Sequence, residues 1–137
     1  MRTGVGRPAC AETLPRVPES ARAARHLVSS MLRAWGLEEL ELAAHIVVTE
    51  LVSNAVVHAR QSSVRVTVSR LDRLEVQLAV VDMSRDLPRS RTAGAEEESG
   101  RGLALVAALT DGRWGADPLP WGKRVWARLA AGEGDTR

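Results

Sequence analysis

The chain has 137 residues, of which 45% are apolar, and a formal net charge of +2 at neutral pH, which indicates one domain with a real core. Its 18 Arg are scattered rather than gathered in basic runs with aromatic residues, which disfavours direct nucleic-acid binding. Cys10 is the single cysteine, so an internal disulfide and a cysteine metal cluster are excluded. No apolar run reaches about 18 residues and no apolar signal core opens the chain, so we expect a cytoplasmic protein without a membrane span.

The first third of the chain is expected to hold a tail and two helices. Residues 1–13 contain small residues without periodicity and are predicted to be a flexible tail before a single domain over residues 14–131. Residues 132–137 are predicted to be a second tail. Apolar residues at helical spacing predict one helix from about 18 to 34 and another from about 38 to 59.

The rest of the chain is predicted to be mainly strands. Residues 84–99 are predicted to be a long loop, and residues 103–109 a short apolar helix. Hairpins with segregated helices predict an α+β, two-layer sandwich, whose mixed, mostly antiparallel sheet is covered on one face by about three helices. The predicted strands are 64–69, 74–82, 113–116 and 123–129.

Three polar residues share one edge of the second predicted helix. Glu50, Asn54 and His58 follow one another at four-residue spacing, so they lie beside the apolar stripe that faces the core. Glu50 and Asn54 are compatible with a solvated helix face or with a site. In a site, an amide oxygen suits Mg²⁺, and a carboxylate one turn away can orient or deprotonate a nucleophile. His58 is interpreted as a helix-end residue, because positive charge is favoured near a helix C-terminus.

Asp82 ends the second predicted strand in phase with its inward-facing apolar residues. This phase places a carboxylate at the inner end of a core strand, where it can accept a hydrogen bond from an amino group such as that of adenine. Gly100 and Gly102 precede the predicted helix 103–109. They are typical either of a tight turn into a helix or of an anion site at a helix N-terminus.

Three segments together resemble the N, G1 and G2 boxes of the gyrase/histidine-kinase ATPase superfamily (GHKL), which has the Bergerat-type ATP-binding fold. They are Glu50–His58, Val80–Ser84 and Gly100–Val106, and the loop 84–99 stands in the place of the ATP lid. The resemblance covers about residues 14–130. Within the superfamily the chain is most similar to the small single-domain bacterial group related to anti-sigma factor serine kinases.

The resemblance implies a site for ATP and Mg²⁺. Asn54 would bind the Mg²⁺ that bridges the ATP phosphates, and Asp82 would accept from the adenine amino group. Glu50 would be the base that activates a serine hydroxyl of a partner protein, or a water. The other residues implied in nucleotide binding are Ser84, Gly100, Arg101, Gly102, Leu103 and Lys123. Ser84 and Arg124 stand where the family commonly has glycine and threonine.

The resemblance also implies a function and its partners. The first expectation is an ATP-dependent serine/threonine protein kinase of the anti-sigma factor type. Its partners would be an anti-sigma factor antagonist protein, a sigma factor or both, with room for a homodimer. The rival expectation is a non-catalytic module that binds ATP and thereby sequesters a partner. Glu50 favours the kinase, because a module that only binds need not keep a base.

Overall fold

The structure is a computed structural model that describes residues 8–58, 63–82, 93–120 and 122–132. Within these ranges the side chains of His58 and of residues 93–101 are not described. The elements in chain order are β1 (Ala9–Pro15), α1 (Ser20–Ala34), a short 3-10 turn (Glu38–Leu40), α2 (Glu41–His58), β2 (Ser63–Asp72), β3 (Glu75–Asp82), α3 (Ala93–Thr110), β4 (Trp114–Leu119) and β5 (Gly122–Ala130).

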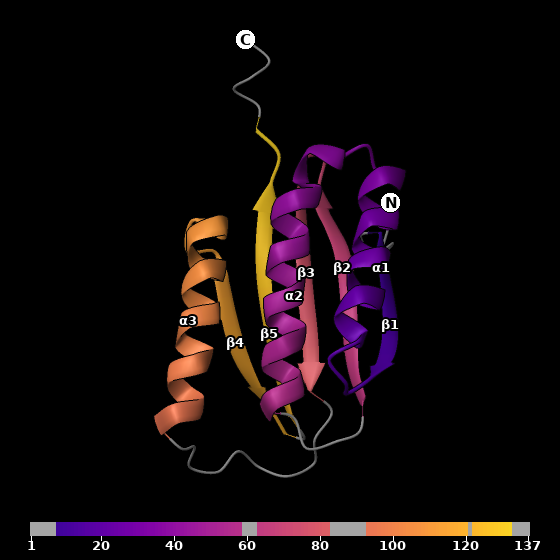
Figure 1. Ribbon diagram of the computed structural model, residues 1–137. Helices are drawn as coiled ribbons and strands as arrows, with labels where there is room; N and C mark the ends of the chain where they lie inside the picture. Colours follow the sequence, from indigo (N-terminus) through magenta and orange to yellow (C-terminus); the bar gives the residue numbers. More distant parts are fainter. Residues whose placement is uncertain (1–7, 59–62, 83–92, 121, 133–137) are drawn as a thin grey trace.

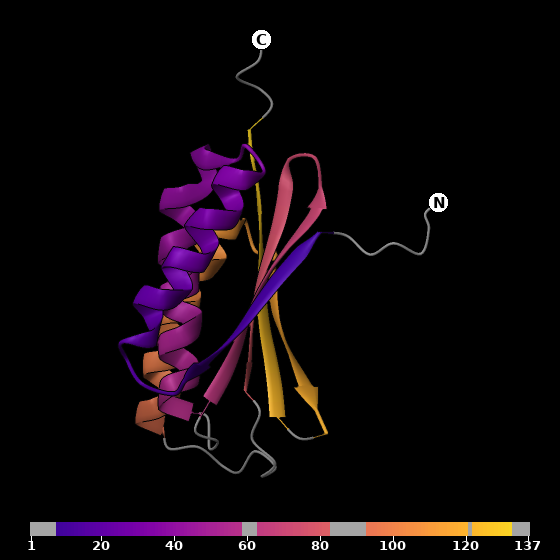
Figure 2. The same cartoon turned by 90° about the vertical axis from the view of Figure 1, so that its right-hand side faces the viewer.

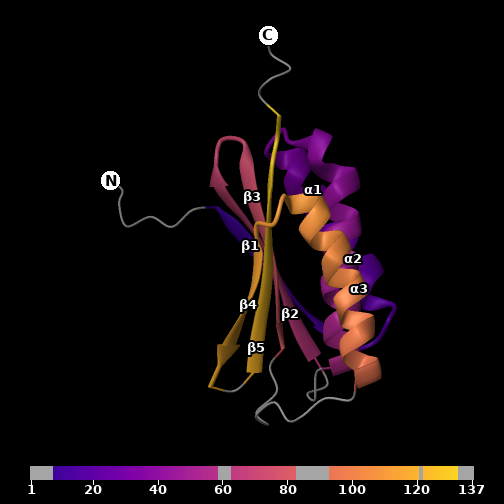
Figure 3. The same cartoon turned by 90° about the vertical axis from the view of Figure 1, so that its left-hand side faces the viewer.

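The strands form one five-stranded sheet in the order β1-β2-β3-β5-β4, and every neighbouring pair is antiparallel. The three helices lie side by side on one face of this sheet, with α2 between α1 and α3 (Figure 1). Views along the sheet show the helices on one side and no helix on the other (Figures 2 and 3). The predicted two-layer α+β sandwich is therefore confirmed, with a sheet that is wholly antiparallel rather than mixed.

The core lies between the sheet and α2. Alternate residues of β2 and β3 point toward the helices because successive side chains of a strand face opposite sides. Val64, Val66 and Val68 of β2 are fully buried, as are Val76 and Leu78 of β3. The inward phase predicted for the second hairpin strand is thus confirmed. These valines, which are β-branched, and Leu78 fill a core that has no Phe or Tyr.

Helix α2 is apolar around most of its circumference because it contacts α1, α3 and the sheet. Its stripe Val48, Leu51 and Val52 is fully buried, and Ala55 is nearly so. The segment Glu38–Val57 is long and apolar enough to cross a membrane by length and composition. Core helices of globular proteins meet the same criterion, and in this fold the helix is the central element of the helical layer (Figure 1).

The first strand is absent from the sequence prediction, which assigned residues 1–13 to a flexible tail. Residues 9–13 belong to β1, which pairs with β2 from Ala9 opposite Ser69 to Pro15 opposite Ser63. Leu14 is the one fully inward residue of this edge strand. An edge strand that buries so little shows no alternation, so only its pairing with β2 defines it.

The start of α3 also differs from the prediction. The helix begins at Ala93, within the predicted loop 84–99, so Gly100 and Gly102 lie inside it rather than before it. Between Ala93 and Gly102, Ala, Glu and Ser together outnumber Gly. Because Ala and Glu are strong helix formers, they offset the cost of about 1 kcal/mol for each glycine. The rest of the predicted loop, residues 83–92, lies outside the described part of the chain.

The uncovered face of the sheet is closed by side chains of its own strands. Trp126 of β5 lies on Gly115 of β4, where an added Cβ would come within 2.7 Å of the indole ring. The guanidinium carbon of Arg128 lies 4.9 Å from the centre of the Trp126 ring, and its Nε donates to Gln77 at 2.9 Å. This layer keeps Gln77 and Ala79 buried on a face that no helix covers.

Candidate functional site

Four elements meet at one end of the sandwich. The end of β3, the start of β5, the C-terminal half of α2 and the N-terminal half of α3 all lie toward the lower edge of Figure 1. They carry most of the residues that the sequence assigned to a nucleotide site. Helix α2 contacts both α3 and β3.

Two of these residues, Glu50 and Gly102, approach each other closely. Glu50, half-buried on α2, directs its carboxylate at α3, where an added Cβ on Gly102 would lie 2.6 Å from Oε1 and 3.7 Å from Cδ. Such a distance is far below van der Waals contact, so glycine is the residue that permits this position of Glu50. The predicted G2 box on α3 therefore contacts the predicted N box on α2 at the pair Gly102 and Glu50.

We predict a non-additive effect of Gly102→Ala on stability. In a Glu50→Ala background the change should stabilise the domain by about 0.5–1 kcal/mol, because alanine is the better helix former. With Glu50 present this gain should disappear, because the new methyl group displaces the carboxylate. Urea denaturation of the four proteins of this double-mutant cycle measures the difference. Equal effects in both backgrounds would contradict the contact.

Asp82 ends β3 at the same edge. In the sheet register it stands between Val64 of β2 and Lys123 of β5. Asp82 and Lys123 are both half-buried, and each already has a polar or electrostatic partner. The register thus brings a carboxylate and an ammonium group that are distant in sequence to neighbouring strands at one end of the sheet.

We predict that Asp82→Asn weakens ATP binding by about ten- to a hundredfold, the loss expected for one charged hydrogen bond. The melting temperature without ligand should change little, because the side chain is half-buried at a strand end. Calorimetric titration with ATP measures the affinity. Asp72→Asn, at the far end of the same hairpin, is the matched control, since its Oδ1 can still accept from the Leu74 amide. A large loss of ligand-free stability would instead make Asp82 structural.

Asn54 lies one turn after Glu50 on α2 and is also half-buried. It has an interaction partner within the protein. The predicted edge of α2 is therefore formed for Glu50 and Asn54. The third predicted residue of this edge, His58, is the last residue of α2, and its side chain lies outside the described part of the chain.

The remaining predicted residues divide into three groups. Leu103 packs against the hydrophobic core, which gives it a structural role. Gly100 and Arg101 are on α3 but their side-chain surroundings are not described, and Ser84 lies outside the described residues. The predicted anion site at a helix start is not formed by Gly100 and Gly102, because both are interior to α3. Backbone N–H groups inside a helix bond to the preceding turn and do not face a phosphate.

Comparison with known families identifies the domain. A family model described as the histidine kinase-like ATPase domain matches residues 14–114. The chain belongs to this family. The matched part of this ATPase domain includes Glu50, Asn54, Asp82 and Gly102, and it ends before Lys123. No curated protein matches the chain.

Membership of an ATPase domain family implies ATP binding. The donor set at the site fits Mg-ATP chemically. Mg²⁺ takes oxygen ligands and commonly needs only one or two from protein, the rest being phosphate oxygens and waters. Asn54 can supply such an oxygen, and Asp82 can accept from an amino group. Within the described residues no group of three or more His, Cys, Asp or Glu is arranged to hold a metal by itself.

One cluster on this ATPase domain was missed by the sequence analysis. Arg22, Arg25, His26, Ser29 and Arg33 follow one another on α1 at spacings of one to four residues. Helical spacing places such residues on one side of a helix. That spacing could have revealed the cluster, but its contacts with α2 are visible only in the fold.

Proposed function

We propose that this ATPase domain is a serine/threonine protein kinase of the anti-sigma factor type, which phosphorylates a serine of an antagonist protein. The observation that carries the proposal is the contact of the Glu50 carboxylate with Gly102. A general base must lie within hydrogen-bond reach of the hydroxyl that it deprotonates. A carboxylate held between α2 and α3, beside Asn54, supports that role.

In this mechanism each residue has one task. Asn54 would hold the Mg²⁺, which would supply charge neutralisation at the phosphates. Asp82 accepts from the adenine amino group and so orients the nucleotide. Glu50 takes the proton of the serine hydroxyl while the serine oxygen bonds to the γ-phosphorus. The bond from that phosphorus to the bridging oxygen breaks, and ADP leaves.

The proposal extends to the partners and the compartment. The substrate would be an anti-sigma factor antagonist protein, and a sigma factor would be held in an inactive complex that exchanges with it. A homodimer is compatible with the proposal. The protein would act in the cytoplasm, without direct contact with nucleic acid or membrane.

The second candidate is a non-catalytic module that binds ATP and sequesters a partner. The same contact favours it in one respect, since Glu50 packed on Gly102 joins α2 to α3 whether or not any phosphoryl group is transferred. Incubation with γ-labelled ATP, Mg²⁺ and candidate antagonist proteins separates the two. Labelled antagonist supports the kinase, whereas ATP binding without transfer overturns it in favour of the module.

A further inference from the structure

A basic pocket lies over α1 and the N-terminal half of α2. Its volume is about 420 Å³. Most of its lining residues belong to α1, which α2 separates from α3 (Figure 1). We call it the α1 pocket. Its lining residues are Arg22, Arg25, His26, Ser29, Ser30, Arg33 and His45.

One side of the α1 pocket is fixed by three contacts between α1 and α2. Nη1 of Arg25 donates to Oγ1 of Thr49 at 3.0 Å. The hydroxyl of Ser29 and Nε2 of His45 share a hydrogen bond of 2.5 Å. These bonds hold the wall of the pocket in place, because each joins side chains from two packed helices.

The third contact is an ion pair of Arg33 with Glu41, in which Nε and Oε2 are 3.1 Å apart. A hydrogen bond from Ser29 and the positive charge of Arg33 lower the pKa of Glu41. Glu41 thus neutralises one of the three guanidinium groups of the pocket.

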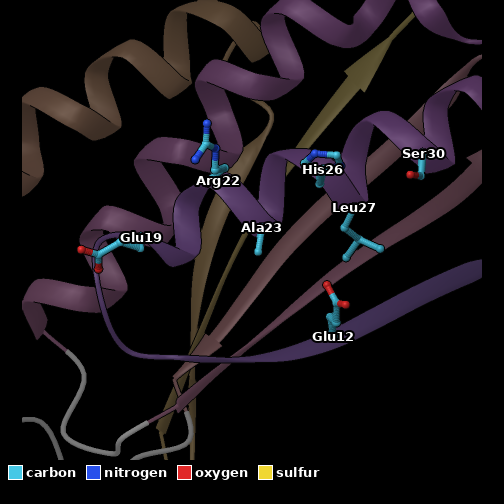
Figure 4. Close-up of a pocket in the computed structure, with 7 residues that line it drawn as sticks. All are labelled: Glu12, Glu19, Arg22, Ala23, His26, Leu27 and Ser30. Atoms are coloured by element: carbon cyan, nitrogen blue, oxygen red, sulfur yellow. The ribbon is translucent and has the colours of Figure 1, made fainter.

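The other side of the pocket carries side-chain donors that have no acceptor among the described residues. Arg22, His26 and Ser30 stand four residues apart along α1, so they form one line on the helix. No side-chain hydrogen bond or ion pair of these three residues is formed with any residue in the described part of the chain. All three also line an adjoining hollow between α1 and β1, shown in Figure 4.

The two acidic residues of that hollow lie on β1 and at the start of α1. In Figure 4 Glu12 points from β1 toward α1, and Glu19 lies at the N-terminal end of the helix, while Arg22 points away from the strand. Negative charge near β1 would repel an anion from that side. The favourable position for an anion is therefore on the α2 side, among the guanidinium groups of Arg22 and Arg25.

We propose that the α1 pocket is a binding site for a phosphoryl group, separate from the nucleotide site. A phosphate dianion offers several acceptor oxygens, which match a guanidinium fork, an imidazole N–H and a hydroxyl better than the two oxygens of a carboxylate do. Planar guanidinium groups bind phosphate in pairs of hydrogen bonds, and Arg22 is placed to do so. The group is carried either by inorganic phosphate or by a phosphorylated peptide. The proposal does not depend on the kinase activity.

The test is an NMR titration of the full chain with inorganic phosphate, against sodium chloride at matched ionic strength. We expect saturable amide shifts confined to α1 and the start of α2, with a dissociation constant on the order of 1 mM. Arg22→Gln should weaken binding by about tenfold or more. Arg65→Gln, an exposed arginine of β2, is the control and should leave binding unchanged.

Two further arms separate the site from the nucleotide site and identify the source. Asn54→Ala should keep phosphate binding at α1. A peptide with phosphoserine, compared with its unmodified serine form and with free phosphate, shows which carrier binds more tightly. Shifts confined to Asp82 and Gly102, shifts that do not saturate, or an Arg22→Gln variant that binds like the parent would each overturn the proposal.

Discussion

Replacing Asn54 with alanine is expected to lower the affinity for Mg-ATP by more than about a hundredfold. Loss of a residue that only supports a metal ligand already lowers metal affinity by about 10- to 100-fold, and Asn54 is proposed to be a ligand itself. The affinity for ATP without Mg²⁺ should change much less, since the lost group is proposed to be an oxygen ligand of the metal. Calorimetric titration with ATP, with and without Mg²⁺, measures both. The difference between the two losses, rather than either alone, assigns the residue to the metal.

The controls follow from the position of Asn54 on α2. Ser53→Ala changes an exposed neighbour and should leave both affinities intact. Because Asn54 has a partner within the fold, its removal can also affect stability, so the melting temperature is measured for each variant. Asn54→Asp retains an oxygen and should recover Mg²⁺-dependent binding. Unchanged Mg-ATP affinity in Asn54→Ala would remove the metal assignment.

Replacing Glu50 with glutamine is expected to reduce phosphotransfer by about 10²- to 10⁴-fold, the usual contribution of a general base. Glutamine has the same shape and keeps the packing on Gly102, but it cannot take the proton. The affinity for Mg-ATP should therefore stay within about threefold of the parent, a change below 1 kcal/mol. Transfer of label to an antagonist protein and calorimetry measure the two quantities.

Glu38→Gln is the matched control, because Glu38 is an exposed acid before α2. Transfer at the parental rate by Glu50→Gln would show that Glu50 is not the base. If the parent itself transfers no label while it binds Mg-ATP, the non-catalytic module is the better description. The Glu50–Gly102 contact would then serve only to couple α2 to α3.

Much of the fold could be predicted because its core elements carry strong local patterns. Alternation in β2 and β3 and the apolar stripe of α2 reflect direct burial, so their limits were predicted to within a few residues. The pattern failed for β1, which buries little beyond Leu14 at the edge of the sheet. It also misplaced the start of α3, where glycines suggested a break that the surrounding helix formers overcome.

By itself the sequence determined the inward phase of Asp82 and the shared edge of Glu50 and Asn54, because both follow from the fixed periods of strands and helices. Only the tertiary structure decided that Glu50 meets Gly102 and that Lys123 stands opposite Asp82. These relations join elements that are distant along the chain, and their packing and register leave no periodic signal. The α1 pocket is likewise decided only by the tertiary structure, because its walls come from two helices whose contact leaves no local pattern in the sequence.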